Sequence, residues 1–185
     1  MPTCYVLLAD GFEEIEALTP VDLLRRAGCH VVTIAVAQNP VMGAHGIAVT
    51  ADRTADAVDL SAPFDLVLFP GGMPGATNLD ENPFTDVILS AAAEHGAVVS
   101  AICAAPLVLG KRGLLCGKRA TCYPGFESHL AGAIVEDVPV VTDGNIITGA
   151  AMGAAETFGL ALVDALCGAK TADKVRASIH PRDNC

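Results

Sequence analysis

The residues of this sequence that could carry out chemistry gather in three turns, each of which follows a short apolar run. These turns span residues 10–16, 70–75 and 102–106. The third places Cys103 between a predicted strand and the start of a helix, where free N–H groups and the helix dipole stabilise a thiolate and lower the thiol pKa. A cysteine at a random position is more often a buried side chain that packs like alanine. The position of Cys103 nevertheless makes it a candidate nucleophile.

Small residues around Cys103 favour a reactive role over a packing role. Ala101 and Ala104 allow the chain to turn sharply from strand to helix, as a nucleophile elbow requires. Gly71 and Gly72, in the second turn, can bring a backbone N–H beside the sulfur. The sequence therefore predicts a thiol with neighbouring amide donors, which is the arrangement that covalent catalysis by cysteine needs.

Apolar runs alternate with helical patterns along the chain and must position these turns. Strands are predicted at residues 4–9, 31–36, 66–69, 97–102 and 120–122, hairpins at 41–49 and 138–148, and helices at 13–26, 82–96, 104–110, 154–166 and 171–178. This alternation indicates an α/β fold, a three-layer α/β/α sandwich around a mostly parallel central sheet. The carboxyl ends of parallel strands meet at one edge, so we expect the three turns to open there together.

The composition is typical of one domain with a large core. Hydrophobic residues make up 52% of the 185 residues and charged residues 17%, which excludes disorder and fits a single domain over residues 1–185. Eleven Lys and Arg against 21 Asp and Glu give 11 − 21 = −10. Because this charge repels phosphate backbones and anionic lipid surfaces, we expect neither nucleic acid nor a membrane as a partner.

Targeting signals, metal motifs and cofactor motifs are not apparent in the sequence. The most apolar stretch, residues 97–110, is shorter than the ~20 residues that a bilayer span requires. The first residues lack a basic segment, so we expect a cytoplasmic protein. Seven cysteines without a C-x-x-C pair argue against a disulfide framework and a zinc site. The five histidines lack paired spacing and the turn at 70–75 lacks G-x-G-x-x-G, so we predict no metal and no cofactor.

Four segments together resemble the DJ-1/ThiJ/PfpI superfamily, and within it the DJ-1/YajL branch. A-I-C-A-A-P occupies 101–106, G-F-E-E-I-E occupies 11–16, P-G-G-x-x-G occupies 70–75, and P-V-D-L-L-R-R-A-G occupies 20–28. They keep the order and spacing of the family over nearly the whole chain. The resemblance implies a flavodoxin-like homodimer with Cys103 as the reactive cysteine, Glu16 as its partner carboxyl, and the backbone N–H groups of Gly72 and Ala104 as oxyanion donors.

A carboxyl beside a thiol makes chemical sense only in one protonation state. A negative Glu16 would raise the pKa of Cys103, so a thiolate requires Glu16 to hold its own proton and to donate it toward the sulfur. The two groups then titrate together. The alternative interpretation of Glu16 is a solvated acid of the first helical turn, and this is what we expect of Glu13 and Glu14.

Departures from the family pattern bear on the substrate. Ala104 stands where protease-like members carry the histidine of a Cys-His pair, which argues against a peptidase. Tyr123 aligns with a pocket histidine of the human-type branch, and His45 lies near the position of an arginine of that branch. The candidate pocket residues are Gly71, Tyr123, His45 and Arg26.

The leading functional hypothesis is a cysteine-dependent, cofactor-independent stress-protection enzyme that acts on small aldehydes. A thiolate adds to an aldehyde to form a hemithioacetal, so we expect glyoxalase or deglycase activity, with methylglyoxal converted to lactate. The alternative is a non-enzymatic sensor of oxidative stress or a redox-regulated chaperone, in which the same cysteine is oxidised to a sulfinic acid. A third possibility is a binding module in which Cys103 only packs.

Overall fold

A seven-stranded sheet forms the centre of the computed structural model, which describes residues 1–180 and leaves Cys185 outside. The strand order is β10-β11-β7-β6-β1-β2-β5. The strands are β1 (Thr3–Leu8), β2 (His30–Ala35), β5 (Arg53–Thr54), β6 (Leu66–Phe69), β7 (Val98–Ile102), β10 (Val140–Asp143) and β11 (Ile146–Gly149). All neighbours pair in parallel except β10 and β11, which form the predicted hairpin.

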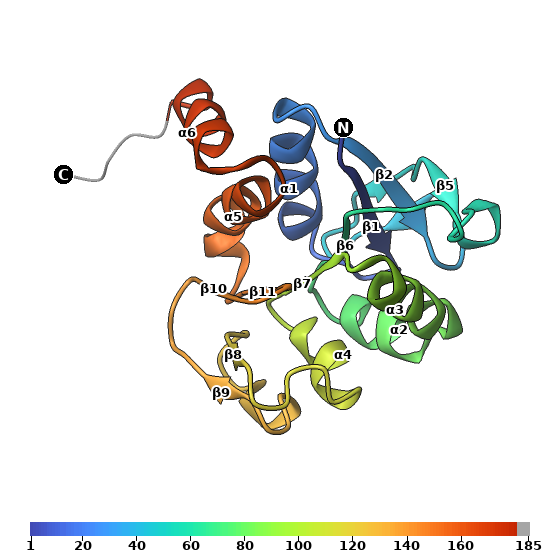
Figure 1. The fold of residues 1–185 in the computed structure, drawn as a ribbon. Helices are drawn as coiled ribbons and strands as arrows, with labels where there is room; N and C mark the ends of the chain where they lie inside the picture. The colour runs from blue at the N-terminus through green and yellow to red at the C-terminus, as the bar shows by residue number, and fades with distance from the viewer. Residues whose placement is uncertain (181–185) are drawn as a thin grey trace.

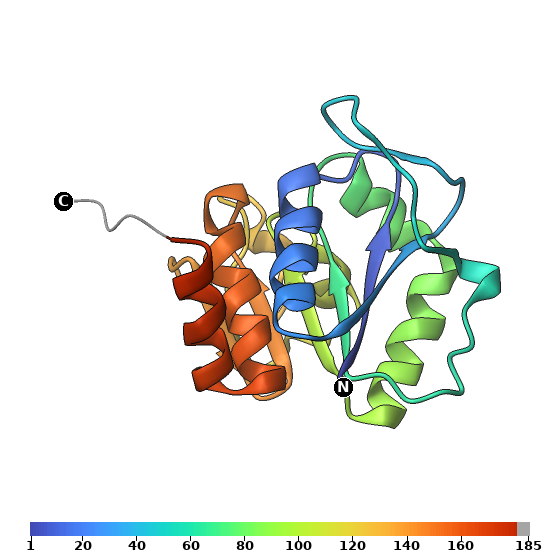
Figure 2. The same cartoon turned by 90° about the horizontal axis from the view of Figure 1, so that it is seen from above.

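Helices cover both faces of this sheet (Figures 1 and 2). One face carries α1 (Glu14–Arg26), α5 (Ala155–Cys167) and α6 (Ala169–Ser178), and the other carries α2 (Gly75–Glu81), α3 (Pro83–His95) and α4 (Pro106–Lys111). The predicted three-layer α/β/α sandwich is therefore confirmed. Within residues 1–180, no helix has both the length and the hydrophobicity needed to cross a membrane.

Short elements complete the chain outside the main sheet. The predicted hairpin at 41–49 is confirmed as an antiparallel pair, whereas the second small sheet is a parallel pair. These strands are β3 (Val41–Met42) with β4 (Ala48–Val49) and β8 (Arg119–Ala120) with β9 (Ile134–Val135), and the 3-10 helices are η1 (Ala55–Ala57), η2 (Glu127–His129) and η3 (Met152–Ala154).

The apolar run of β1 is continuous because both faces of the strand are buried. Tyr5 and Leu7 point into the core under α2, α3 and α4, whereas Cys4, Val6 and Leu8 point into the core under α1 and α5. Successive side chains of a strand point to opposite faces, so a central parallel strand needs apolar residues at every position. This packing fixes the carboxyl end of β1, after which the turn at residues 10–16 begins.

Helix α3 begins and ends where its capping residues predict. The side chain of Asn82 accepts a hydrogen bond from the N–H of Phe84 (2.9 Å), and Pro83 fills the first helical position. Gly96 ends the helix with φ 66°, a left-handed conformation that glycine adopts readily. The preceding helix α2 was not predicted, because its first residue is Gly75 and no side chain caps its start.

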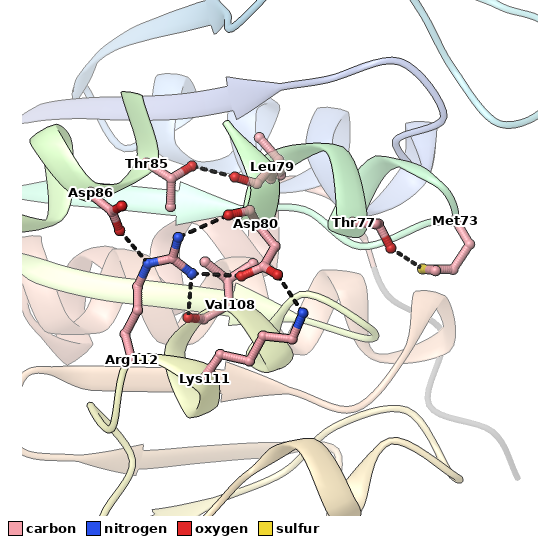
Figure 3. A network of polar contacts seen from close by, with 9 residues as sticks. All are labelled: Met73, Thr77, Leu79, Asp80, Thr85, Asp86, Val108, Lys111 and Arg112. Atoms are coloured by element: carbon pink, nitrogen blue, oxygen red, sulfur yellow. Dashed lines mark hydrogen bonds and ion pairs between the residues drawn. The ribbon is translucent and has the colours of Figure 1, made fainter. Parts of the chain in front are cut away.

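Ion pairs join α2 and α3 to α4 (Figure 3). Arg112, which follows α4, contacts Asp80 of α2 and Asp86 of α3, each at 2.6 Å, and Lys111 contacts Asp80 at 2.5 Å. Arg112 also donates to the carbonyl of Asp80 (2.9 Å) and to that of Val108 (3.0 Å). The network holds the end of α4, the helix that begins directly after the turn of Cys103.

Candidate active site

The turns at residues 10–16, 70–75 and 102–106 meet at the carboxyl ends of β1, β6 and β7, which are neighbours in the sheet. Backbone hydrogen bonds join the first two turns. The N–H of Glu13 donates to the carbonyl of Gly71 (2.9 Å), and the N–H of Gly75 donates to the carbonyl of Gly11 (3.1 Å). The sheet therefore brings together segments that are about 55 residues apart in sequence, as the topology predicts.

Cys103 occupies a strained backbone conformation at the end of β7. Its φ is 65°, in the left-handed region that residues other than glycine rarely adopt. Its N–H donates to the carbonyl of Gly149 at the end of β11 (2.9 Å), and its carbonyl accepts from the N–H of Tyr123 (2.8 Å). Two downstream segments therefore hold the strand-to-helix turn in the sharp conformation that the small neighbouring residues predict.

The side chain of Glu16 is fully buried and reaches from α1 to this turn. Its Oε2 accepts from the N–H of Gly71 (3.1 Å), while its Oε1 has no hydrogen-bond partner among residues 1–180. A Cβ atom placed on Gly71 would lie 2.5 Å from Oε2 of Glu16 and 2.7 Å from the Cβ of Cys103. Glycine at position 71 thus leaves the space in which the carboxyl and the thiol residue approach each other.

Burial controls the protonation of Glu16. Burial and the negative charge of Glu13 raise the pKa of Glu16 to about 7, although hydrogen bonds with Cys103 and Gly71 oppose the rise. A carboxyl transferred from water into a protein interior favours its neutral form. Glu16 therefore exchanges its proton near neutral pH, which is the range in which a carboxyl can act both as a base and as an acid.

The thiol departs from the sequence-based expectation. Burial, followed by the charge of Glu16 and its hydrogen bond, raises the pKa of Cys103 to about 12, although the backbone N–H groups of Gly72 and Ala104 act in the opposite direction. We expected a lowered pKa because those donors and the helix start favour a thiolate. Desolvation and the adjacent carboxylate outweigh them, so the sulfur keeps its proton while Glu16 is ionised.

The candidate pocket residues lie at different distances from this pair. Gly71 contacts Glu16 directly, and Tyr123 adjoins Cys103 through its backbone while its ring packs edge-on against Phe126. The assignment of Arg26 to the pocket is wrong. Arg26 is ten positions after Glu16 on α1, about 15 Å along the helix, and pairs with Asp22 at 2.6 Å.

His45 belongs to a cluster at the start of α1. Its N–H and its Nδ1 both lie 2.9 Å from the carboxylate of Glu14, and Nδ1 lies 3.6 Å from Glu13. The expectation that Glu14 is solvated is wrong, since only 4% of the residue is exposed. Although burial raises the pKa of Glu14, hydrogen bonds from His45 and the backbone lower it overall. Glu14 thus anchors the β3–β4 hairpin to α1.

The same cluster has donor atoms of the kinds that bind metals. One ligand-type atom of each of Glu13, Glu14 and His45 lies within 4.8 Å of the others. The hydrogen bonds of His45 to Glu14 account for this proximity without an ion. Sequence reasoning missed both this cluster and Gly149, because neither a hairpin docked on a helix nor a carbonyl acceptor on a distant strand leaves a local pattern.

Known proteins are similar to this chain in both sequence and fold. The Parkinson disease protein 7 homolog of Danio rerio is 34% identical over 182 residues, covering 96% of both chains. A protein named deglycase from Pyrococcus horikoshii is 33% identical over 145 residues, covering 77% of this chain and 86% of the relative. A C103A mutant of a DJ-1 superfamily protein from Salmonella typhimurium superposes with a TM-score of 0.90 at 35% identity, covering 98% of this chain and 100% of that chain.

The family assignment rests on nearly the whole chain. Residues 2–165 match the DJ-1/PfpI family, and the similar solved structure has the same fold. The resemblance drawn from the turns at 11–16, 70–75 and 101–106 is thereby confirmed. This protein belongs to the DJ-1/PfpI family.

Proposed function

We propose that this protein is a cofactor-independent enzyme of the glyoxalase or deglycase type that acts on small reactive carbonyls. The observation that carries the proposal is the pair of Cys103, at a strained strand-to-helix turn, and Glu16, a buried carboxyl with a pKa near 7. The relative named deglycase supports the same class of activity. We take methylglyoxal as the substrate and lactate as the product.

The raised pKa of Cys103 sets the order of proton transfers. Because the resting thiol keeps its proton, the ionised carboxyl of Glu16 acts first as a general base. It accepts the thiol proton as the sulfur attacks the aldehyde carbon, and it then gives this proton to the former carbonyl oxygen. The product is a hemithioacetal, in which the π bond of the aldehyde carbonyl is broken, a new C–S bond is formed, and the oxygen stays on the carbon as a hydroxyl.

The same carboxylate then moves hydrogen between the two carbons of the dicarbonyl. Glu16 removes the C–H proton of the former aldehyde carbon and returns it to the former ketone carbon, while the hydroxyl proton of the former aldehyde oxygen passes to the former ketone oxygen. These transfers give the thioester of lactate. Water attacks this thioester, the C–S bond breaks, and the sulfur of Cys103 regains a proton. The reaction adds one water molecule to methylglyoxal and needs no external oxidant or reductant.

Two backbone amides would support these reaction steps. The N–H groups of Gly72 and Ala104 interact with the sulfur of Cys103 and favour negative charge there. When the sulfur bonds to carbon, we expect the adjacent oxygen of the adduct to use these donors as it becomes negative.

Proton NMR of methylglyoxal mixed with the protein alone, without glutathione, tests the proposal. Lactate should accumulate, and Cys103→Ser or Glu16→Gln should each lower its rate by about a hundredfold or more, since each removes a group that forms or breaks bonds. The exposed cysteine in Cys116→Ser provides the matched control and should leave the rate unchanged. Absence of lactate, or an unimpaired Glu16→Gln protein, would contradict the mechanism.

A different observation, the unpartnered Oε1 of Glu16, supports the alternative function of a redox sensor. Oε1 of Glu16 is buried without a partner among the described residues, and the Glu16 side chain interacts with that of Cys103. A sulfinic acid on Cys103 would supply a hydrogen-bonding group to this carboxyl. Glu16→Gln distinguishes the two functions because the amide keeps a hydrogen-bond donor but is not a base. Under the sensor hypothesis, mild peroxide still adds two oxygens to Cys103 in this variant, as mass spectrometry would measure.

A further inference from the structure

A second group of cysteines lies at the amino ends of the parallel strands, whereas Cys103 lies at the carboxyl ends. The Sγ atoms of Cys29 and Cys167 are 3.6 Å apart, and Cys4 interacts with Cys29 through its side chain. Cys4 is at the start of β1 and Cys29 directly precedes β2, whereas Cys103 follows the end of β7. A six-residue strand spans about 20 Å, so the two thiol groups are separate sites.

The contact between Cys29 and Cys167 is a tertiary contact made by two fixed backbones. The residues are 138 positions apart in sequence. Cys29 donates its N–H to the carbonyl of Leu24 (3.0 Å) after α1 ends, and Cys167, the last residue of α5, accepts at its carbonyl from the hydroxyl of Thr171 (3.0 Å). Helices α1 and α5 pack side by side (Figure 2), which brings their carboxyl ends together.

We propose that Cys29 and Cys167 form a reversible disulfide when the protein meets a peroxide. The sulfur of Cys167 attacks one peroxide oxygen, the O–O bond breaks, and a sulfenic acid and water result, with the thiol proton carried away in the water. The sulfur of Cys29 then attacks that of Cys167 and displaces hydroxide, which takes the Cys29 proton and leaves as water. Two thiols and one hydrogen peroxide thus give one disulfide and two water molecules.

Accessibility assigns the roles within the pair. Cys167 is partly exposed, whereas Cys29 is 7% exposed and Cys4 is fully buried. Peroxide therefore reaches Cys167 first, and Cys29 is the sulfur already in contact with the oxidised product. Burial, followed by interactions with Cys167, raises the pKa of Cys29 to about 11, so the Cys29 thiol keeps its proton at neutral pH.

The disulfide would link two segments that are 138 positions apart in sequence. Sulfurs in a disulfide are about 2.05 Å apart, so the pair needs to close by about 1.5 Å from its present separation. The link would join the carboxyl end of α5 to the connection between α1 and β2. Because it closes a long segment of chain, it restricts the unfolded state and should raise the melting temperature of the oxidised protein.

Peroxide treatment of the Cys103→Ser protein tests this proposal independently of the proposed enzyme activity. After the remaining thiols are blocked with iodoacetamide, mass mapping should identify a peptide pair linked through Cys29 and Cys167. A non-reducing gel should show a faster-migrating monomer that disappears with dithiothreitol. Separate alkylation of both cysteines, further oxidation of Cys167 alone, or linkage of Cys167 to a different cysteine would overturn the proposal.

Matched variants complete the experiment. In the same background, Cys29→Ala and Cys167→Ala should each abolish the linked peptide and the faster band, while Cys116→Ala should keep both. A circular dichroism melt of each variant under reducing conditions establishes that it folds. Oxidation should raise the melting temperature of the protein that keeps both cysteines and leave that of Cys29→Ala unchanged, and an equal shift in the two proteins would count against the disulfide.

Discussion

Protonation links the chemistry of Glu16 to the stability of the whole protein. Its folded-state pKa, raised by burial to about 7, lies above the ordinary value of 4.5. The folded protein therefore favours the neutral carboxyl. The resulting stabilisation is fully present below pH 4.5 and is lost as the pH rises through 7, because the unfolded chain then ionises freely while the folded chain must ionise a buried group.

Replacement of Glu16 by glutamine should remove this pH dependence. A difference between 4.5 and about 7 corresponds to roughly 3 kcal/mol at 1.36 kcal/mol for each pH unit. Urea unfolding at pH 5 and pH 8 should therefore show that the stability of Glu16→Gln relative to the original protein rises by about 2.5 kcal/mol from pH 5 to pH 8, since part of the effect is already present at pH 5. Equal pH dependence in the two proteins would show that Glu16 ionises as an exposed carboxyl does.

At the scale of elements, the turn at 70–75 determines how closely α1 approaches β7. Gly71 has no Cβ, and this lets the carboxyl of Glu16 lie against the Cys103 residue while the N–H of Gly71 holds Oε2. The turn thus acts as a spacer between Glu16 and Cys103 that has no room for a side chain at position 71. The sequence identified Gly71 as a pocket residue, but only the structure shows that its value lies in the missing side chain.

A methyl group at this position should therefore impair catalysis. In Gly71→Ala, the new Cβ would meet atoms of Glu16 and Cys103 at 2.5 and 2.7 Å, so one of them must move. We expect lactate formation to fall by about a hundredfold, because a displacement of about 1 Å in reacting groups has effects of this size. Gly153→Ala, where a Cβ meets open space, is the control. Comparable rates in the two variants would contradict the spacer role.

The ion pairs of Arg112 show how a surface element supports the site from outside. Arg112→Ala removes the contacts of α4 with Asp80 and Asp86 and should lower the free energy of unfolding by about 2 kcal/mol, since the Asp80 carboxylate is largely buried. Arg26→Ala, which breaks an exposed i,i+4 pair, should cost less than about 0.5 kcal/mol. Thermal or urea unfolding measures both, and similar losses would argue against a special role for the Arg112 network.

At the scale of the whole molecule, local patterns predicted most of the frame. The apolar strands, the capped helix α3 and the hairpin after Asp143 are specified by neighbouring residues, and the structure confirms them. The proximity of Glu16 to Cys103 was predictable only through the family resemblance. The burial of Glu14 and the upward shift of the Cys103 pKa were not predictable, because both depend on burial by segments far away in sequence.

The backbone conformation of Cys103 depends on hydrogen bonds with residues that are translated after it. Its N–H is held by Gly149 and its carbonyl by Tyr123, and both follow it in the chain. During translation, the elbow therefore cannot take its final shape until Gly149 has left the ribosome and β11 has docked on β7. The growing polypeptide therefore carries Cys103 without its strained turn, which forms only in the nearly complete protein.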